Sequence, residues 1–205
     1  MLVLTSTSGQ LGGGVLKYIL SKNLIPPSQL IISASNPATV PSSAKEAGIP
    51  IRHGDMKKPS TLESSYKGAD ILFLVTFPSI GMERVELHKA AIDAAKKVGM
   101  KHVIYTSLMF GGETGEKSKA EVMQPHIQSV AYLKASGMTW TIVREGIYAE
   151  IWNHFAGLIQ VDDTMNPIDM VVAGDGPMAW TGRQELSEGT AAVVAKAVRN
   201  PFALF

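Results

Sequence analysis

The chain has 205 residues, a formal net charge of +1 and no cysteine, and 18% of its residues are charged. This length fits one α/β domain with a well-buried core, or one domain with an incomplete second one. The near-neutral charge excludes the basic surface of a typical nucleic-acid-binding protein, and the lack of cysteine excludes disulfides, thiol catalysis and cysteine-based zinc sites. No apolar run approaches the roughly 20 residues of a membrane span and no signal-like region precedes the first strand, so we expect a cytoplasmic protein.

The N-terminal residues predict a strand, turn and helix that together hold an anion. An apolar run at 1–4 leads into Thr-Ser-Thr-Ser-Gly-Gln-Leu-Gly at 5–12, and a helical pattern begins at Leu11. In such a unit, backbone N–H groups and the positive end of the helix face a pyrophosphate, and glycine allows the ligand to approach. The spacing Ser6-x-x-Gly9-x-x-Gly12 has serine where the pattern of short-chain reductases begins with glycine. A glycine-rich helix start without a ligand is therefore the alternative.

The glycines at 12, 13 and 14 strengthen the interpretation of this turn as functional. Each is less favourable than alanine by about 1 kcal/mol in a helix interior. Close packing or the approach of a ligand would explain three of them in a row.

Strands and helices alternate along the rest of the chain, which predicts an α/β, Rossmann-like, doubly wound parallel sheet with helices on both faces. The expected strands are 1–4, 29–34, 48–55, 70–76, 101–106, 139–143 and 169–173. The expected helices begin at Leu11, at 42, at the capping box 60–63, at 82, near Pro125, at 151 and at 185.

Two parts are expected along the chain. A dinucleotide-binding domain covers 1–150, and a smaller substrate-side segment at 151–205 packs on it. The residues Phe202, Leu204 and Phe205 are apolar and follow the last expected helix closely. This ending predicts that the C-terminal part is incomplete.

The end of the second expected strand bears on the choice of dinucleotide. An acidic residue there binds the ribose hydroxyls of NAD, whereas a basic residue suits the 2′-phosphate of NADP. The strand ends in Ser-Ala-Ser-Asn-Pro at 33–37, and no acid occurs between Gly9 and Glu46. NAD is therefore disfavoured and NADP(H) is the expected cofactor, although no arginine lies at the tip to support it directly.

Five segments, at 5–12, 35–37, 53–55, 94–107 and 141–148, carry a family resemblance in their order and spacing. Together they resemble the NmrA-like family of atypical short-chain dehydrogenases/reductases over essentially the whole chain. The members most similar in pattern are bacterial NADPH:quinone reductases and their fungal relatives. The resemblance implies an enzyme, an NADPH-dependent oxidoreductase that transfers hydride to a quinone or conjugated carbonyl compound. The alternatives are a non-catalytic NAD(P)-sensing regulator and a reductase scaffold turned to non-redox chemistry.

The resemblance also implies which residues hold the cofactor. Those expected around the pyrophosphate are Ser6, Ser8, Gly9, Gln10 and Leu11, with Ser35 and Asn36 near the adenosine ribose and Asp55 and Met56 by the adenine. Those expected farther along are Thr76, Phe77 and Pro78 at the middle of the cofactor, and Thr106, Ser107, Leu108 and Tyr148 toward the nicotinamide. The family commonly has glycine at position 6 and arginine at position 35, so both serines are expected to weaken binding.

The catalytic candidates differ from the tyrosine and lysine pair of ordinary short-chain reductases. The spacing Tyr-x-x-x-Lys occurs at Tyr18 and Lys22, on the first expected helix and far from the expected nicotinamide. In isoflavone-reductase-like relatives a lysine acts as the acid at the position that matches His126. Histidine can donate a proton near neutral pH, so His126 is the candidate acid, with a solvated first-turn histidine as the alternative. Tyr148 is the second candidate, as a hydrogen-bond donor to a substrate carbonyl or as a packed residue that caps the pocket.

The expected substrate pocket is bounded by aromatic and histidine side chains. These are Phe77, Phe110, His126, Tyr148 and Trp152. Reduction of a quinone by hydride needs little acid catalysis, because the hydroquinone anion can take its proton from water. A missing catalytic pair therefore does not exclude this reaction.

The remaining polar residues are expected to be structural or solvated. His88 is expected to pack against the sheet, and Glu145, Glu150 and Asp162-Asp163 to be solvated charges, with no metal site. We expect a small-molecule substrate and no nucleic-acid or membrane partner. A protein partner belongs to the sensor alternative, and a homodimer is left open.

Overall fold

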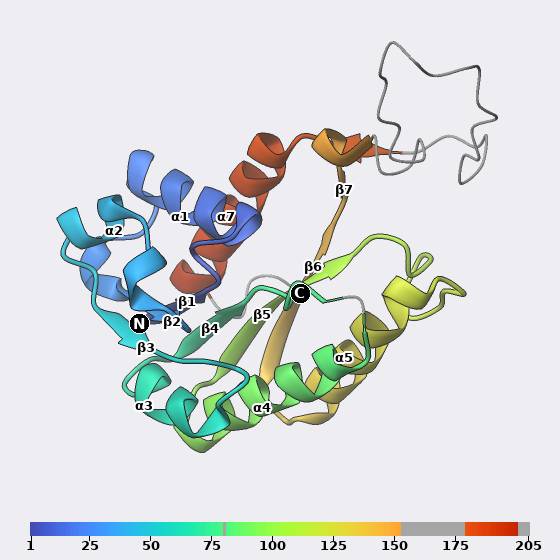
Figure 1. The fold of residues 1–205 in the computed structure, drawn as a ribbon, viewed down its shortest axis with the longest axis horizontal. Helices are drawn as coiled ribbons and strands as arrows, with labels where there is room; N and C mark the ends of the chain where they lie inside the picture. The colour runs from blue at the N-terminus through green and yellow to red at the C-terminus, as the bar shows by residue number, and fades with distance from the viewer. Residues whose placement is uncertain (80, 153–178, 201–205) are drawn as a thin grey trace, which may run out of the picture.

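A six-stranded, all-parallel sheet forms the centre of the molecule in the computed structural model, which describes residues 1–79, 81–152 and 179–200 (Figure 1). Its strand order, β3-β2-β1-β4-β5-β6, is that of a Rossmann fold and confirms the predicted class. The strands are β1 Leu2–Thr5, β2 Leu30–Ala34, β3 Ile51–His53, β4 Ile71–Leu74, β5 His102–Leu108 and β6 Thr139–Glu145. The strand order reverses between β1 and β4, and in such sheets ligands bind at the carboxyl ends of the strands near this reversal.

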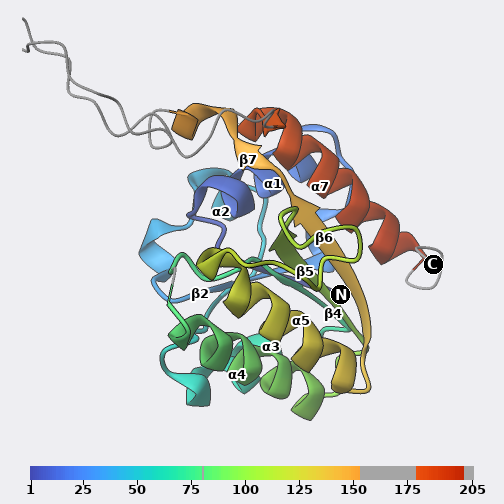
Figure 2. The ribbon, with the colours of Figure 1, turned by 90° about the vertical axis from the view of Figure 1, so that its right-hand side faces the viewer.

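Helices cover both faces of the sheet (Figures 1 and 2). Side chains of β1 alternate between them, because Leu2 and Leu4 pack with α1 and α7 whereas Val3 packs with α3, α4 and α5. Both faces are apolar, as a parallel sheet with helices on each side requires. The helices are α1 Gln10–Ser21, α2 Ser42–Glu46, α3 Leu62–Tyr66, α4 Glu83–Lys97, α5 Gln124–Ala135 and α7 Arg183–Arg199.

The C-terminal helix α7 belongs to the same core as the first strand. Ala191, Val194 and Ala195 of α7 are fully buried in the cluster that contains Leu2 and Leu4. The helix thus packs on the face of the sheet that α1 also covers. The division of the chain at residue 150 stays a prediction.

Two local features differ from the sequence-based expectations. Ser60 does not cap α3, because it lies inside the 3₁₀ helix Pro59–Thr61, and the Thr61 hydroxyl donates to the Lys58 carbonyl oxygen at 2.8 Å. A small parallel pair, β7 Ile147–Tyr148 with β8 Trp180–Thr181, was not expected.

Three expectations fall outside the described residues. The expected helix beginning at 151 continues past residue 152, and the strand 169–173 and the pair Asp162-Asp163 lie wholly beyond it. Within the described ranges, no helix has the length and apolar character needed to cross a membrane.

Candidate functional site

A cavity of about 480 Å³ lies at the carboxyl edge of the sheet, across the point where the strand order reverses. The turn after β1, the ends of β2, β4, β5 and β6, and the first turns of α4 and α5 form its wall. The predicted site residues that line it are Ser6, Ser8, Gly9, Gln10, Leu11, Ser35, Asp55, Met56, Thr76, Phe77, Pro78, Thr106, Ser107, Leu108, His126 and Tyr148. Residues far apart in the sequence are thus brought together around one volume.

Three predicted site residues are not part of the cavity wall. The side chain of Asn36 bonds to the local backbone, because its Oδ1 accepts a hydrogen bond from the Ala38 N–H at 3.1 Å. Phe110 and Trp152 are 36% and 63% exposed. Among the described residues, the aromatic wall of the cavity therefore comes from Tyr66, Phe77 and Tyr148.

The turn after β1 has the shape of an anion-binding turn. Its Ser6 has φ +54°, the left-handed region that favours glycine, and the Gly9 N–H donates to the Ser6 carbonyl oxygen at 2.9 Å. A Cβ on Gly12 would lie 2.4 Å from the same oxygen, so only glycine allows α1 to start this close to the turn. No side chain caps the N-terminus of α1 and no acid lies in its first turn. Its free N–H groups and positive dipole therefore fit the pyrophosphate of a dinucleotide.

The end of β2 forms another part of the wall and carries no carboxylate. Ser33, Ala34 and Ser35 line the cavity there. A Cβ on Gly54 would lie 2.2 Å from Ser33 Oγ, which explains the close approach of the loop after β3. The carboxylate of Asp55 is also in the wall, but its Oδ1 accepts from the Lys57 N–H at 2.9 Å.

Two threonines fix the loop that follows β4. Thr5 Oγ1 donates to the Phe73 carbonyl oxygen and accepts from the Val75 N–H, both at 3.0 Å. The Thr76 N–H donates to Thr106 Oγ1 at 2.9 Å. The loop is thereby tied to the strands on either side of β4.

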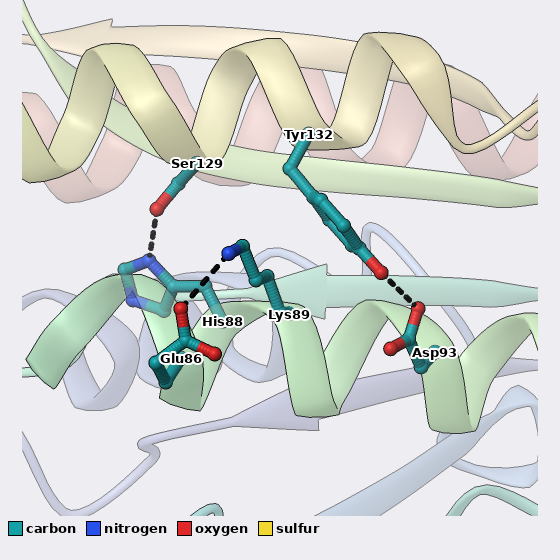
Figure 3. A network of polar contacts seen from close by, with 6 residues as sticks. All are labelled: Glu86, His88, Lys89, Asp93, Ser129 and Tyr132. Carbon is teal, nitrogen blue, oxygen red and sulfur yellow. Dashed lines mark hydrogen bonds and ion pairs between the residues drawn. The ribbon is translucent and has the colours of Figure 1, made fainter.

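His88 of α4 also anchors this loop, through Phe77. Its ring lies between α4 and α5 and contacts Ser129 of α5 (Figure 3). The Phe77 N–H donates to His88 Nε2 at 2.9 Å, so the ring carries its proton on Nδ1 and donates it to Ser129 Oγ, also at 2.9 Å. Burial, and then the charge of Arg84, lowers the pKa of His88 to about 3. The ring is fully buried and packs edge-on against Tyr105 of β5, which confirms that His88 packs against the sheet.

His126 is fully buried in the first turn of α5, so the alternative of a solvated histidine was wrong. A guanidinium can only donate, so Arg84 Nη1 donates to His126 Nε2 at 2.6 Å and the ring proton lies on Nδ1, which faces Tyr105 Oη at 3.2 Å. Burial and the neighbouring Arg84 lower the pKa of His126 to about 4. The imidazole is uncharged at neutral pH and both its nitrogens are engaged, which does not favour the predicted role as an acid.

Arg84 is a cavity residue that the sequence analysis missed. It lies in the first turn of α4, is 6% exposed and lines the cavity beside His126. Its position in the sequence resembles that of an ordinary surface cation on a helix. The one available signal was its place at a helix N-terminus, where a positive charge is unfavourable.

Glu145 is the second missed residue, and the expectation that it is a solvated charge was wrong. It is 4% exposed at the end of β6 and lines the cavity. Its Oε1 accepts from the Thr190 hydroxyl of α7 at 2.9 Å, whereas its Oε2 is buried without a hydrogen-bond partner among the described residues. Burial raises the pKa of Glu145 to about 7, so a large fraction of the group is protonated at neutral pH.

Glu150 is a solvated charge, as expected, and Tyr148 lines the cavity. Tyr148 is half-buried in the cavity wall, and burial, then the nearby Glu145, raises the pKa of its phenol. The neutral phenol can donate a hydrogen bond. Glu150 is exposed and accepts from the Arg183 N–H at 3.0 Å.

Comparison with known proteins extends these observations. A family model described as NAD(P)H-binding matches residues 7–176. The NmrA-like family domain-containing oxidoreductase flvB of Aspergillus flavus is 35% identical over 192 residues, which cover 92% of this chain and 60% of the relative. Quinone oxidoreductase 2 of Escherichia coli is 29% identical over 96% of this chain and 65% of its own length.

The solved structures agree with this family assignment. The crystal structure of the E. coli NADPH-dependent quinone oxidoreductase QOR2 in complex with NADPH has a TM-score of 0.79 and 28% identity, over 96% of this chain and 65% of that one. The chain thus spans 60 to 65% of the length of the relatives described. With its Rossmann strand order, its uncapped anion-binding turn and this match, the chain belongs to the NAD(P)H-binding family and is a homologue of NmrA-like oxidoreductases.

Proposed function

We propose that the chain is an NADPH-dependent reductase of quinones or conjugated carbonyl compounds. The observation that carries the proposal is the continuous cavity, which begins at the anion-binding turn of Ser6 to Gly12 and extends over β4 and β5 to Tyr148. The named relatives are oxidoreductases, one of quinones, which supports this activity over the sensor alternative.

The residues present fit a bound dinucleotide. The turn after β1 and the first turn of α1 would hold the pyrophosphate, and Ser35, Asp55 and Met56 would border the adenosine. The absence of a carboxylate in the described part of the β2 end favours NADPH, because a carboxylate there would repel the 2′-phosphate. When bound, the cofactor supplies a hydride.

The chain itself orients the substrate and excludes water. Phe77 and Leu108 present apolar surface toward the cavity, and the neutral phenol of Tyr148 would donate a hydrogen bond to a carbonyl oxygen of the substrate. His88 would hold the loop of Thr76 to Pro78 in place, and His126 would hold the guanidinium of Arg84. Neither would transfer protons, because their nitrogens are already engaged.

The first test is a calorimetric titration of the purified protein with NADPH and NADH, followed by turnover of NADPH with a simple quinone. We expect NADPH to bind more tightly than NADH, and the quinone to be reduced. The variant Ser8→Glu places a carboxylate at the exposed rim of the turn and should abolish NADPH binding by repulsion. Ser42→Glu makes the same charge change on α2, away from the cavity, and should bind normally. If the wild-type protein bound neither dinucleotide, the proposal would be overturned.

A further inference from the structure

Arg84 is a buried cation in the cavity wall, and no carboxylate in the described part of the chain lies within 4 Å of its guanidinium. Its Nη1 donates to His126, and its Nε is buried without a hydrogen-bond partner among the described residues. Within the described chain the guanidinium therefore has no ion-pair partner, although Glu83 in the same helical turn attracts it from a longer distance.

The surroundings of Arg84 make its positive charge unfavourable in free energy. Removing a guanidinium from water carries a desolvation penalty, and burial lowers the pKa of Arg84 accordingly. The N-terminal turn of α4 adds the positive end of a helix dipole. The adjacent imidazole of His126 is neutral and accepts only one hydrogen bond from the guanidinium. An anionic group in the cavity would offset all of these costs.

Arg84 lies at the end of the cavity beside β5, away from the anion-binding turn, and this is the end where the substrate would bind. Its contact with His126, whose other nitrogen faces Tyr105, places it beside β5 and on the face of the sheet that α4 and α5 cover. The anion-binding turn follows β1 and leads into α1, which covers the opposite face. Because β4 lies between β1 and β5, the two strands are roughly 10 Å apart. Arg84 is thus separated from the turn that would hold the pyrophosphate.

We propose that Arg84 binds the anionic oxygen that forms on the substrate during reduction. This inference rests on the proposed function. A quinone that accepts a hydride, with its electron pair, becomes a hydroquinone monoanion, which then takes one proton from water to give the neutral hydroquinone. The free N–H donors of Arg84 make charge-assisted hydrogen bonds to that oxygen, so the stabilisation appears as the negative charge develops. Arg84 is then a catalytic residue and replaces the missing tyrosine and lysine pair as the electrophilic group.

The first experiment measures oxyanion binding without cofactor or turnover. The probe is 4-nitrophenol, whose phenolate is recognised by its own absorbance. The cofactor-free protein should bind the phenolate form and lower the pKa of the bound phenol below its value in water. The variant Arg84→Met should lose this shift, and Arg84→Lys should retain part of it because the positive charge remains. The control Arg199→Met removes a cation on α7, away from the cavity, and should behave as the wild type.

The second experiment separates the substrate from the cofactor as the source of the anionic oxygen. In Arg84→Met, kcat for quinone reduction should fall about 100-fold or more, as when one donor to a developing oxyanion is removed, while the Kd for NADPH stays within about threefold. A tenfold weaker Kd for NADPH would assign Arg84 to a cofactor phosphate and overturn the inference. An effect on KM alone, restricted to substrates that already carry a carboxylate, would also overturn it.

The two experiments distinguish failure of this inference from failure of the proposed function. If the wild type binds phenolate through Arg84 yet does not reduce quinones, oxyanion binding stands and quinone reduction fails. If Arg84→Met reduces quinones as fast as the wild type, the proposed function stands and the inference is overturned. If circular dichroism shows that Arg84→Met does not fold, Arg84→Lys becomes the deciding variant. The inference would then be overturned if Arg84→Lys did not shift the pKa of bound 4-nitrophenol at all.

Discussion

Gly14 of α1 lies directly against Ser187 of α7, and a Cβ built at position 14 would lie 2.2 Å from Ser187 Oγ and 2.8 Å from Ser187 Cβ. The distance accounts for the third glycine in the run at 12–14, where the sequence predicted close packing or ligand approach. Gly12 and Gly13 pack against the turn after β1, whereas Gly14 packs against the last helix. One run of glycines thus serves both the candidate site and the contact that joins α7 to the sheet.

This contact predicts a mutational cycle. Gly14→Ala should lower the free energy of unfolding by about 1–3 kcal/mol, because the new methyl group overpacks the contact with Ser187. Ser187→Gly removes both clashing atoms, so Gly14→Ala made in that background should be neutral or stabilising, since alanine is the better helix former by about 1 kcal/mol. Urea unfolding of the four proteins measures the coupling. Equal effects of Gly14→Ala in both backgrounds would contradict the packing argument.

Ser6 stands where the sequence pattern led us to expect glycine, and its φ of +54° gives that difference a physical cost. A non-glycine residue in the left-handed region loses about 1–2 kcal/mol, part of which is offset because glycine makes the unfolded chain more flexible. We therefore expect Ser6→Gly to raise the free energy of unfolding by about 0.5–1 kcal/mol, measured without ligand.

A control separates this backbone effect from loss of the hydroxyl. Ser6→Ala keeps the left-handed strain and should not be stabilising. NADPH titrations of the same variants should show tighter binding to Ser6→Gly, since the predicted weakening comes from the side chain at the turn. Stabilisation of Ser6→Ala equal to that of Ser6→Gly would show that the hydroxyl, not the backbone, is unfavourable.

The fold class could be predicted because it depends on local signals, whereas the residues expected around the cavity followed from the family resemblance. Apolar periodicity and the spacing of Gly9 and Gly12 specify the first strand, turn and helix, and parallel strands bring their carboxyl ends to one edge. Arg84 and Glu145 could not be found in this way, since burial of a charge is decided by elements distant in sequence. Glu145 is buried because Thr190 of α7 covers the end of β6, a contact 45 residues away. The uncharged state of His126 could not be predicted either, because it depends on Arg84, which lies on another helix.

Ser129 provides a prediction on the link between α4 and α5. Its hydroxyl accepts the Nδ1 proton of the fully buried His88 (Figure 3). The Nε2 atom of the same ring accepts a hydrogen bond from the Phe77 N–H. Ser129→Ala leaves that proton with a weaker partner, Tyr105 Oη at 3.3 Å, and should cost about 1–3 kcal/mol in the free energy of unfolding. The exposed Ser64→Ala is the matched control and should change stability by less than about 0.5 kcal/mol. Equal costs for both variants in urea unfolding would refute the role of the buried network.

Acid should destabilise the protein through His88 and His126. Their folded pKa values, about 3 and about 4, lie below the usual value near 6.5, so the unfolded chain binds more protons once the pH falls below 6.5. The stability they contribute is complete above pH 6.5 and is lost as the pH falls through 4 for His126 and through 3 for His88. His126→Gln should reduce the pH dependence of the unfolding free energy by about 1.4 kcal/mol per pH unit in this range, which is one proton. An unchanged slope in urea titrations from pH 6.5 to 4.5 would contradict the neutral, buried state of His126.

Glu145 should act in the opposite sense. Its folded pKa, about 7, lies above the usual value near 4.3, so between these values the folded protein binds one more proton than the unfolded chain. The stability gained from this proton is complete below about pH 4 and is lost as the pH rises through 7. Holding the ionised carboxylate above pH 8 therefore costs about 4 kcal/mol relative to acid pH. Glu145→Gln cannot ionise and keeps an oxygen for Thr190, so its free energy of unfolding should rise relative to the wild type between pH 5 and pH 8. Glu150→Gln changes an exposed carboxylate whose pKa is lowered by the Arg183 N–H, and it should show no such rise. Urea unfolding of the three proteins at pH 5 and pH 8 tests this prediction. If the difference in unfolding free energy between Glu145→Gln and the wild type were the same at both pH values, Glu145 would be ionised throughout.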